Sequence, residues 1–381
     1  MFIAFAVLIT LSVLSALSLY IAYRLYQGLN AFFPKLNFKP ILVIIILFAS
    51  ILVVGFARSM IPFPRTVEHI LAIICAYTMG VFFYLLMFTV ASDLLLIVFR
   101  LLKLSFTNHR LYKGVMTAIV LALTLCTCVY GFFHALHIKH TSYNVSLQGK
   151  KDISDLNLVL ISDLHLGAVG SEGQLEKTVE NINEENPDIV CIAGDFFDTD
   201  FDSVQDPDKA ISTLRKIRST YGVYVCLGNH DGGSTHNQML DFLEKANIRL
   251  LDDDYTIIDN RLILIGRLDA HSIGGYNGKE RKDLSSFFER KDNSLPVIVM
   301  DHNPSHIHEY GTEADLILCG HTHKGALFPI SLVTDLMYTV DYGHYQKDSA
   351  SPHVIVSSGV GNWGMPMRVG TDCEIVTVNF S

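Results

Sequence analysis

Hydrophobic residues follow two different patterns along this chain of 381 residues. In the first third they form long runs with few charges, whereas from about residue 152 they form short runs separated by polar stretches. A run of about 20 apolar residues can cross a bilayer as a helix, and a run of about four to eight fits a buried strand. The pattern therefore predicts a membrane part, residues 1–140, followed by a water-soluble part.

Four stretches of the membrane part are long and apolar enough to span a bilayer. The first lacks the basic start and the small-residue cleavage site of a signal peptide, so we predict a retained helix. The third is longer than one crossing needs and contains no convincing turn, so we predict one long helix. The predicted spans cover about residues 2–23, 41–57, 69–99 and 115–136.

Basic residues between the spans predict the orientation, because cytoplasmic loops are enriched in Lys and Arg. The loops after the first and third spans carry more of them than the loop after the second span. We therefore expect a multi-pass protein of the cell membrane whose C-terminal domain lies on the extracytoplasmic face. The residues are Arg24, Lys35 and Lys39, then Arg100, Lys103, Arg110 and Lys113, against Arg58 and Arg65.

The membrane part and the water-soluble part also differ in net charge. Residues 1–140 carry a net charge of +8 and the remainder −17, within a total of −9. The acidic part argues against nucleic acid as a partner, and the expected partner is membrane lipid. An odd number of cysteines in apolar or strand-like sequence gives no disulfide framework. Asp93, an acid within the third span, is expected to be paired or interfacial.

The water-soluble part alternates short β-branched or aliphatic runs with polar helical stretches. Strands that are apolar on both faces and alternate with helices are typical of an α/β domain. We predict a linker over residues 141–154 and one α/β domain over 155–381. The predicted strands are 156–161, 189–193, 223–227, 262–265, 297–300, 316–319 and 354–356, with helices near 171–184, 205–219 and 236–246.

Clusters of Asp, Asn and His follow five of these predicted strands. Open α/β sheets place their sites at the carboxyl ends of buried strands. In Asp163-Leu164-His165, the alternation of a strand can direct both polar side chains to one side, and His321-Thr322-His323 repeats the spacing. The predicted metal ligands are Asp163, His165, Asp195, Asn229, His302, His321 and His323.

The chemistry of this set indicates two divalent cations. All seven residues offer oxygen or nitrogen and none a thiolate, which suits Mn²⁺, Fe or Zn²⁺ better than a structural zinc. Asp195 follows the permissive Gly194, which lets the backbone come close to a metal, and its two oxygens can bridge two ions. Two ions favour attack of a bridging hydroxide on a phosphoester. We expect His230 to protonate the leaving group, and Asp231 to orient the His230 imidazole or raise its basicity.

Taken in order, these residues resemble the calcineurin-like metallophosphoesterase family. Its pattern of D-x-H, G-D-x-x-D, G-N-H-[DE], a lone H and G-H-x-H begins here at Asp163, Gly194, Gly228, His302 and Gly320. The resemblance implies a four-layer α/β/β/α sandwich. It also implies one ion bound by Asp163, His165, Asp195 and His323, and a second bound by Asp195, Asn229, His302 and His321.

Two further segments bear on the substrate. Residues 359–368 resemble the ending of membrane-associated, lipid-processing phosphoesterases, although Lys324-Gly325-Ala326 stands where that subgroup has Gly-Gly-Gln. We therefore expect a membrane-bound phosphohydrolase that cleaves a phosphodiester or pyrophosphate bond in a lipid-linked substrate. The alternatives are a phosphomonoesterase or nucleotide hydrolase that the spans merely anchor, and a non-catalytic metal-binding scaffold.

Other polar residues are predicted to be structural. We expect Asp198 to organise a loop, residues 252–254 to form a solvated turn of three aspartates, and Arg368 to hold the C-terminal loop through an ion pair rather than bind phosphate. Structural or surface roles are also expected for His271, His306, His308 and His344.

The predicted orientation can be tested with a reporter enzyme that is active only outside the cytoplasm, fused after Ser381. We expect an active fusion, because the two basic loops should stay in the cytoplasm. The same reporter inserted into the loop after the first span is the matched control and should be inactive. The reverse pattern would contradict the predicted orientation.

Overall fold

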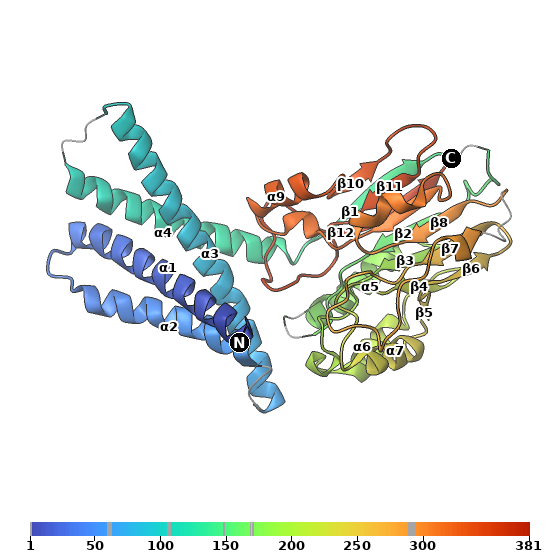
Figure 1. The fold of residues 1–381 in the computed structure, drawn as a ribbon, viewed down its shortest axis with the longest axis horizontal. Coiled ribbons are helices and arrows are strands. Elements are labelled where there is room, and N and C mark those ends of the chain that lie inside the picture. Colours follow the sequence, from blue (N-terminus) through green and yellow to red (C-terminus); the bar gives the residue numbers. More distant parts are fainter. Residues whose placement is uncertain are drawn as a thin grey trace. The chain divides into compact units, whose positions relative to one another are not determined.

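The computed structural model describes residues 2–58, 63–104, 108–147, 149–167, 169, 171–288 and 294–381. The chain folds into two compact units, a helical unit of residues 1–132 and a sandwich unit of residues 133–381. Figure 1 shows the long helices of the first unit and the sheets of the second.

The helical unit consists of four helices, one over each predicted span. All four are long and apolar enough to cross a membrane. The third is unbroken over 37 residues, as predicted, and at 1.5 Å per residue it is about 55 Å long, more than the apolar core of a bilayer. The helices are α1 (Phe2–Phe32), α2 (Phe38–Ala57), α3 (Arg65–Leu101) and α4 (His109–His134).

Asp93, the acid in the third predicted span, has polar partners on another helix. Asp93 on α3 forms an ion pair with Arg24 on α1 and accepts a hydrogen bond of 2.7 Å from Tyr20 Oη. An acid among apolar helices needs such partners, because lipid cannot solvate its charge. Asp93 is therefore paired, as expected.

The sandwich unit contains two six-stranded sheets, ordered β1-β12-β2-β3-β4-β5 and β10-β11-β9-β8-β7-β6. Strands β2 to β5 run parallel, as do β7, β8, β9 and β11. In the first sheet the strands are β1 (Ile138–Val145), β12 (Cys373–Phe380), β2 (Asn157–Ile161), β3 (Ile189–Ala193), β4 (Val223–Cys226) and β5 (Arg249–Leu250). In the second they are β10 (Gly343–Tyr345), β11 (His353–Val356), β9 (Leu316–Cys319), β8 (Val297–Met300), β7 (Leu262–Gly266) and β6 (Asp254–Ile258).

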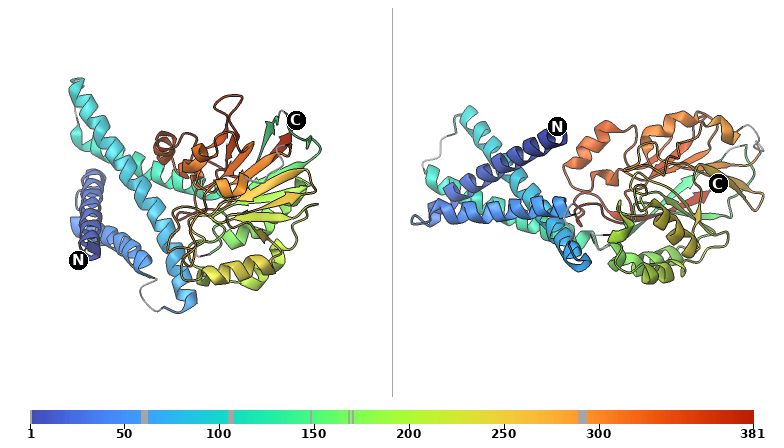
Figure 2. Two further views of the ribbon diagram at one scale, coloured as in Figure 1. Left: turned by 45° about the vertical axis from the view of Figure 1, so that its right-hand side comes forward. Right: turned by 60° about the horizontal axis from the view of Figure 1, so that its bottom comes forward.

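The two sheets pack face to face, and helices cover their outer faces (Figure 2). Leu158 and Leu160 of β2 meet residues such as Leu318 of β9 in the core between the sheets. Val159, which points the other way, packs with the helices α5 (Leu175–Glu184), α6 (Pro207–Leu214) and α7 (His236–Lys245). Helix α8 (Ser285–Phe288) and the 3₁₀ segment Pro304–Tyr310 cover the second sheet. These are the four layers that the resemblance implied.

The seven predicted strands are confirmed to within one residue, because burial on both faces gives each of them a continuous apolar run. The linker predicted over residues 141–154 needs correction. Residues 141–145 belong to β1, which pairs in parallel with β12. The polar residues of β1 are mostly exposed or half-buried, so this strand lacks the continuous apolar run by which the other strands were predicted.

The turn predicted at residues 252–254 is also only partly solvated. Asp253 is fully buried, lies 3.3 Å from Arg267 Nε and accepts a 3.0 Å hydrogen bond from the N–H of Leu268. Arg267 is buried as well. The expectation was wrong for Asp253, because its partner lies 14 residues further along the chain.

Leu318 tests the core between the sheets, since none of its surface is exposed. Leu318→Ala should lower the free energy of unfolding by about 2–5 kcal/mol, because it leaves a cavity. Ile257→Ala, on the exposed face of β6, is the matched control and should change it by less than about 0.5 kcal/mol. The fluorescence of Trp363, the single tryptophan, can follow denaturation of the full chain in detergent. Equal losses for the two variants would contradict this assignment of the core.

Candidate metal centre

The seven predicted ligands come together at the carboxyl ends of strands from both sheets. Parallel strands that end at one edge bring the loops that follow them together. Asp163 and His165 follow β2, Asp195 follows β3, Asn229 follows β4, His302 follows β8, and His321 and His323 follow β9.

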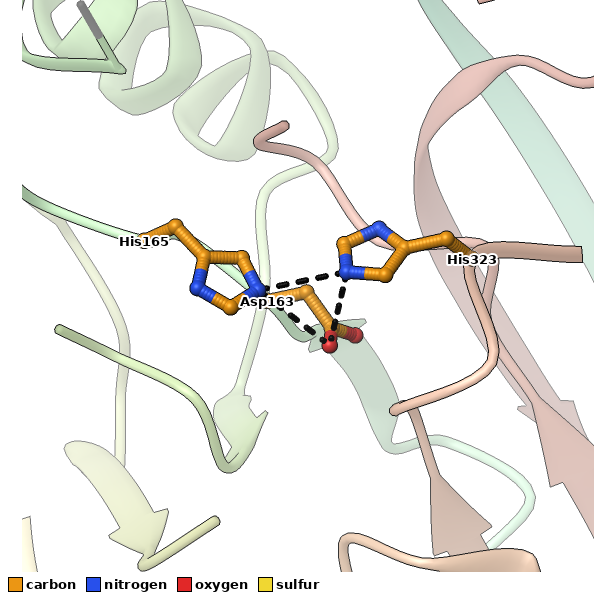
Figure 3. A group of neighbouring side chains, drawn as sticks. All are labelled: Asp163, His165 and His323. Carbon is orange, nitrogen blue, oxygen red and sulfur yellow. Dashed lines mark hydrogen bonds and ion pairs between the residues drawn. The ribbon is translucent and has the colours of Figure 1, made fainter. Parts of the chain in front are cut away.

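Asp163, His165 and His323 form the first cluster (Figure 3). Asp163 Oδ1 lies 3.4 Å from His323 Nε2 and 3.8 Å from His165 Nε2. The two Nε2 atoms are 3.2 Å apart, and both rings face the carboxylate. Two ring nitrogens and a carboxylate oxygen thus converge on a point where one cation could bind all three.

The second cluster contains Asp195, His302 and His321, with Asn229 beside them. His321 Nδ1 lies 3.2 Å from His302 Nε2 and 2.8 Å from Asn229 Oδ1. His302 Nε2 lies 3.1 Å from Asp195 Oδ2. Two nitrogens and two oxygens therefore face one another here as well.

The spacing of these atoms fits two metal ions. Donors that bind one ion at about 2.1 Å lie about 3.0–3.4 Å from one another, depending on the coordination geometry. The measured separations within the two clusters run from 2.8 to 3.8 Å. Asp195 Oδ2 lies 3.8 Å from His165 Nε2 in addition to its contact with His302. This oxygen therefore faces both clusters.

Burial favours the neutral form of three of the imidazoles, which is the form that binds metals. It lowers the pKa of His165 and of His321 to about 3, and that of His323 well below its usual range. His302 differs: burial lowers its pKa, but Asp195 outweighs this and raises it well above the usual range. A cation bound by His302 would therefore displace a proton.

The two carboxylates of the clusters differ in their ionisation. Burial raises the pKa of Asp163 to about 6, so a nearby cation would favour its charged form. Burial also opposes ionisation of Asp195, but His302 and His165 together hold the pKa of that carboxyl below its usual range. Asp195 is thus the permanent negative charge between the clusters.

Five of the seven candidate ligands have a left-handed backbone. Their φ angles lie between 47° and 75°, a region that residues other than glycine rarely adopt. Such conformations cost of the order of 1–3 kcal/mol each and are concentrated at functional sites. The five residues are Asp163, His165, Asp195, His321 and His323.

Two glycines make room for the ligands. Gly194 has a φ of 77°, and a Cβ there would lie 2.7 Å from Cγ of His302. A Cβ on Gly228 would overlap the carboxylate of Asp195. We expected Gly194 to let the backbone approach a metal, whereas its closest neighbour is a ligand ring.

His230 lies beside the clusters in contact with Thr199. Its Nδ1 is 2.5 Å from Thr199 Oγ1, and its ring centroid is 5.1 Å from that of His165. Burial lowers the pKa of His230. Sequence reasoning missed Thr199, since a lone threonine in an irregular loop carries no distinguishing pattern.

Asp231 requires a correction, because its carboxylate does not orient His230. Its oxygens accept hydrogen bonds of 2.9 Å from the N–H of Phe197 and 2.8 Å from the N–H of Gly228. Asp231 is fully buried and therefore clamps the loops after β3 and β4 to each other. Asp198 donates its backbone N–H to the carbonyl of Leu166 at 2.9 Å. With His165 and His230 it also forms a third possible metal-binding group, so its assignment as a loop-organising residue rather than a ligand stays a prediction.

Arg368 also differs from its predicted role. It is fully buried, and its guanidinium donates to the carbonyls of His323 at 3.1 Å and Gly361 at 2.6 Å. The nitrogen that donates to Gly361, Nη2, also lies 3.1 Å from His323 Nδ1. Within the described part of the chain no carboxylate pairs with it. Arg368 thus holds the C-terminal loop through carbonyls and fixes the ring of a candidate ligand.

Residues 324–326 differ in sequence from the Gly-Gly-Gln of the lipid-processing subgroup. Their backbone nevertheless has the left-handed conformation that glycine favours. Lys324 and Ala326 have φ angles of 49° and 55°, on either side of Gly325 at 73°. Lys324 Nζ lies 4.2 Å from the centre of the Tyr342 ring, where a cation is attracted to the aromatic face.

Four histidines for which structural or surface roles were predicted have partners outside the two clusters. His308 lies 3.0 Å from the hydroxyl of Thr339. The remaining contacts are His271 stacked on His306, His306 with Glu309, and His344 with His353.

An open cavity of about 380 Å³ lies over the clusters. Its lining combines candidate ligands and His230 with Ile273, Met337, Tyr338 and Trp363. A polar group with an apolar substituent would match this mixed lining.

Comparison with known proteins agrees with this geometry. Residues 156–325 match a family model described as calcineurin-like phosphoesterase. These residues belong to the calcineurin-like phosphoesterase family. The matched segment contains every candidate ligand and His230.

Proteins similar to this chain include one named as a transmembrane protein. An uncharacterized metallophosphoesterase of Campylobacter jejuni is 29% identical over 378 residues, which cover 97% of this chain and 96% of that protein. A Danio rerio protein named transmembrane protein with metallophosphoesterase domain is 28% identical, covering 88% of this chain and 79% of its own. An uncharacterized metallophosphoesterase of Helicobacter pylori is 30% identical over 227 residues. That match spans only 58% of the Helicobacter protein and 58% of this chain.

The metal content of the purified full chain should depend on Asp195. We expect about two ions per chain after loading with Mn²⁺, and fewer than about one in Asp195→Ala, because Asp195 faces both clusters. His308→Ala, which removes a histidine outside the clusters, is the matched control and should keep both ions. Elemental analysis measures the content, and circular dichroism checks the fold. Two ions retained by Asp195→Ala would contradict a shared ligand.

Proposed function

We propose that the protein is a membrane-bound phosphohydrolase that uses two divalent metal ions to cleave a phosphodiester or pyrophosphate bond. One observation carries this proposal: Asp195 Oδ2 lies 3.1 Å from His302 Nε2 and 3.8 Å from His165 Nε2, and so faces both clusters. A carboxylate shared by two ions is typical of enzymes that hydrolyse phosphoesters. Membership of the calcineurin-like phosphoesterase family supports the same reaction class.

The oxygen and nitrogen donors suit Mn²⁺, Fe or Zn²⁺. When bound, two such ions polarise the phosphate oxygens and lower the pKa of a water molecule. In our assignment one ion is held by Asp163, His165, Asp195 and His323, and the other by Asp195, Asn229, His302 and His321.

His230 is the proposed proton donor to the leaving oxygen. It lines the cavity beside the candidate ligands. Because the Thr199 hydroxyl contacts Nδ1, Nε2 is the nitrogen left to face a substrate. Burial lowers the pKa of His230, and an anionic phosphate in the cavity would oppose that shift by favouring the charged imidazolium. Thr199 would position the ring, and Asp231 would keep the two loops beneath it in place.

We also propose that the substrate is linked to a lipid. The lining of the cavity combines polar groups, suited to a phosphate, with apolar side chains that include Met337 and Trp363. The chain also carries four helices that could cross a membrane.

The orientation of the helical unit is a separate part of the proposal. Arg110 on α4 donates to the carbonyl of Asn30 near the end of α1 at 2.9 Å, which supports both basic loops lying at one end of the helical unit. We propose that this end is cytoplasmic and that the cavity lies outside the cell membrane.

The role of His230 can be tested with an aryl phosphodiester and Mn²⁺, using the full chain in detergent. His230→Gln should lower kcat by a factor of about 10²–10⁴ while metal content stays unchanged, because it removes a proton donor and no ligand. Thr199→Val should cause a smaller loss.

His308→Gln, outside the cavity, serves as the control and should keep full activity. Hydrolysis that survives in both His230→Gln and Asp195→Ala would overturn the proposed reaction. Loss of metal in His230→Gln would instead make this residue a ligand.

A further inference from the structure

Helix α9 (Ile330–Met337) turns its apolar side chains outward. None of its eight residues is buried. Its four largest exposed side chains are Leu332, Val333, Leu336 and Met337, with exposed fractions from 52% to 86%. Helices of soluble domains normally pack their apolar stripe against the core, as α5, α6 and α7 do here. Helix α9 has the opposite arrangement.

The polar side of α9 faces the protein instead. At about 100° per residue, the four exposed apolar residues span an arc of about 140°. Thr334 lies on the other side and donates a 2.8 Å hydrogen bond to Asp341 Oδ2. Asp335, the charged residue of the helix, lies outside the apolar arc. The helix is therefore fastened through polar groups and presents a continuous apolar surface.

Two aromatic residues extend this surface. Phe328, just before α9, and Trp363, in the loop after β11, are each about half exposed. Met337 and Trp363 both line the cavity over the metal clusters, so the surface reaches the mouth of that cavity. Figures 1 and 2 show α9 at the periphery of the sandwich unit. We call this surface the apolar rim: Phe328, Leu332, Val333, Leu336, Met337 and Trp363.

We propose that the apolar rim inserts into the acyl region of a lipid bilayer and holds the mouth of the cavity at the membrane surface. This inference goes beyond the proposed function, because docking does not depend on which bond is cleaved. It concerns the bilayer itself rather than the acyl chain of a single substrate molecule.

The shape of the rim favours a bilayer over a single bound chain. Leu336 is 86% exposed, which places it on a protruding surface and not in a groove. A single acyl chain or a peptide helix binds in a groove that surrounds it. A fluid apolar phase can instead enclose a protruding helix, as it does for amphipathic helices that lie in the membrane interface.

The sequence also places this unit next to a membrane span. Helix α4 ends at His134 and β1 begins at Ile138, so the connection can extend over no more than about 14 Å. The sandwich unit therefore cannot move far from the bilayer that α4 is long and apolar enough to cross. Tryptophan, found here at one edge of the rim, is enriched where protein meets the membrane interface.

Trp363 allows a direct test, because it is the only tryptophan of the chain. The full-length protein is reconstituted into phosphatidylcholine vesicles, with or without bromine on the acyl chains. We expect brominated lipid to quench Trp363 fluorescence by about half, since interfacial insertion reaches about 5–10 Å into the bilayer. Iodide in the water should quench little.

Two results would overturn the proposal. Quenching by iodide without quenching by brominated lipid would place the rim in water. Protection from both quenchers would mean that protein covers the rim, either the helical unit or a second copy of the chain.

A double variant assigns the effect to α9. Leu332→Glu with Leu336→Glu, neither of which lines the cavity, should reduce quenching by brominated lipid at least about threefold, because charged side chains resist insertion. Ile257→Glu, the same change at an exposed position on β6, is the matched control and should leave quenching unchanged. Quenching retained in the double variant would overturn the assignment. Fluorescence needs no turnover, so an inactive protein would count against the proposed function alone.

Discussion

A single buried carboxylate determines how the sandwich unit must be built. Asp195 faces both groups of candidate ligands, and those groups come from loops of two different sheets. The carboxyl ends of β2, β3 and β4 must therefore lie against those of β8 and β9. Face-to-face packing of two largely parallel sheets satisfies this condition, and it does so around an apolar core.

Other buried polar groups serve the same geometry by holding loops. Asp231 fixes the loops after β3 and β4 through their backbone N–H groups, and Arg368 joins the C-terminal loop to the ring and carbonyl of His323. Five ligands with left-handed backbones would otherwise relax to more common conformations. Stability and coordination geometry thus depend on the same hydrogen bonds.

Sequence patterns predicted the features that are local in the chain. Buried strands appear as apolar runs, helices long enough for a membrane appear as longer ones, and the ligands follow strands at fixed spacings. The features that sequence reasoning missed depend on distant partners. The pairing of β1 with β12, of Asp253 with Arg267 and of Thr199 with His230 each joins segments that are separated in sequence. From the motif, Asp231 was expected to act on His230. Only the structure shows that its carboxylate instead binds the backbone N–H groups of two loops.

The position of β12 has a consequence for the order of folding during synthesis. Strand β12 lies between β1 and β2, the first two strands of the sandwich unit. Until residues 373–380 have been made, β1 has no partner strand and β2 has only β3. The helices precede the sandwich in the chain and emerge from the ribosome long before that point. The first sheet can therefore close only after residues 373–380 have left the ribosome, and until then two strand edges stay open to wrong partners. If the sandwich unit is translocated as we propose, the same delay keeps its first sheet open while the unit crosses the membrane.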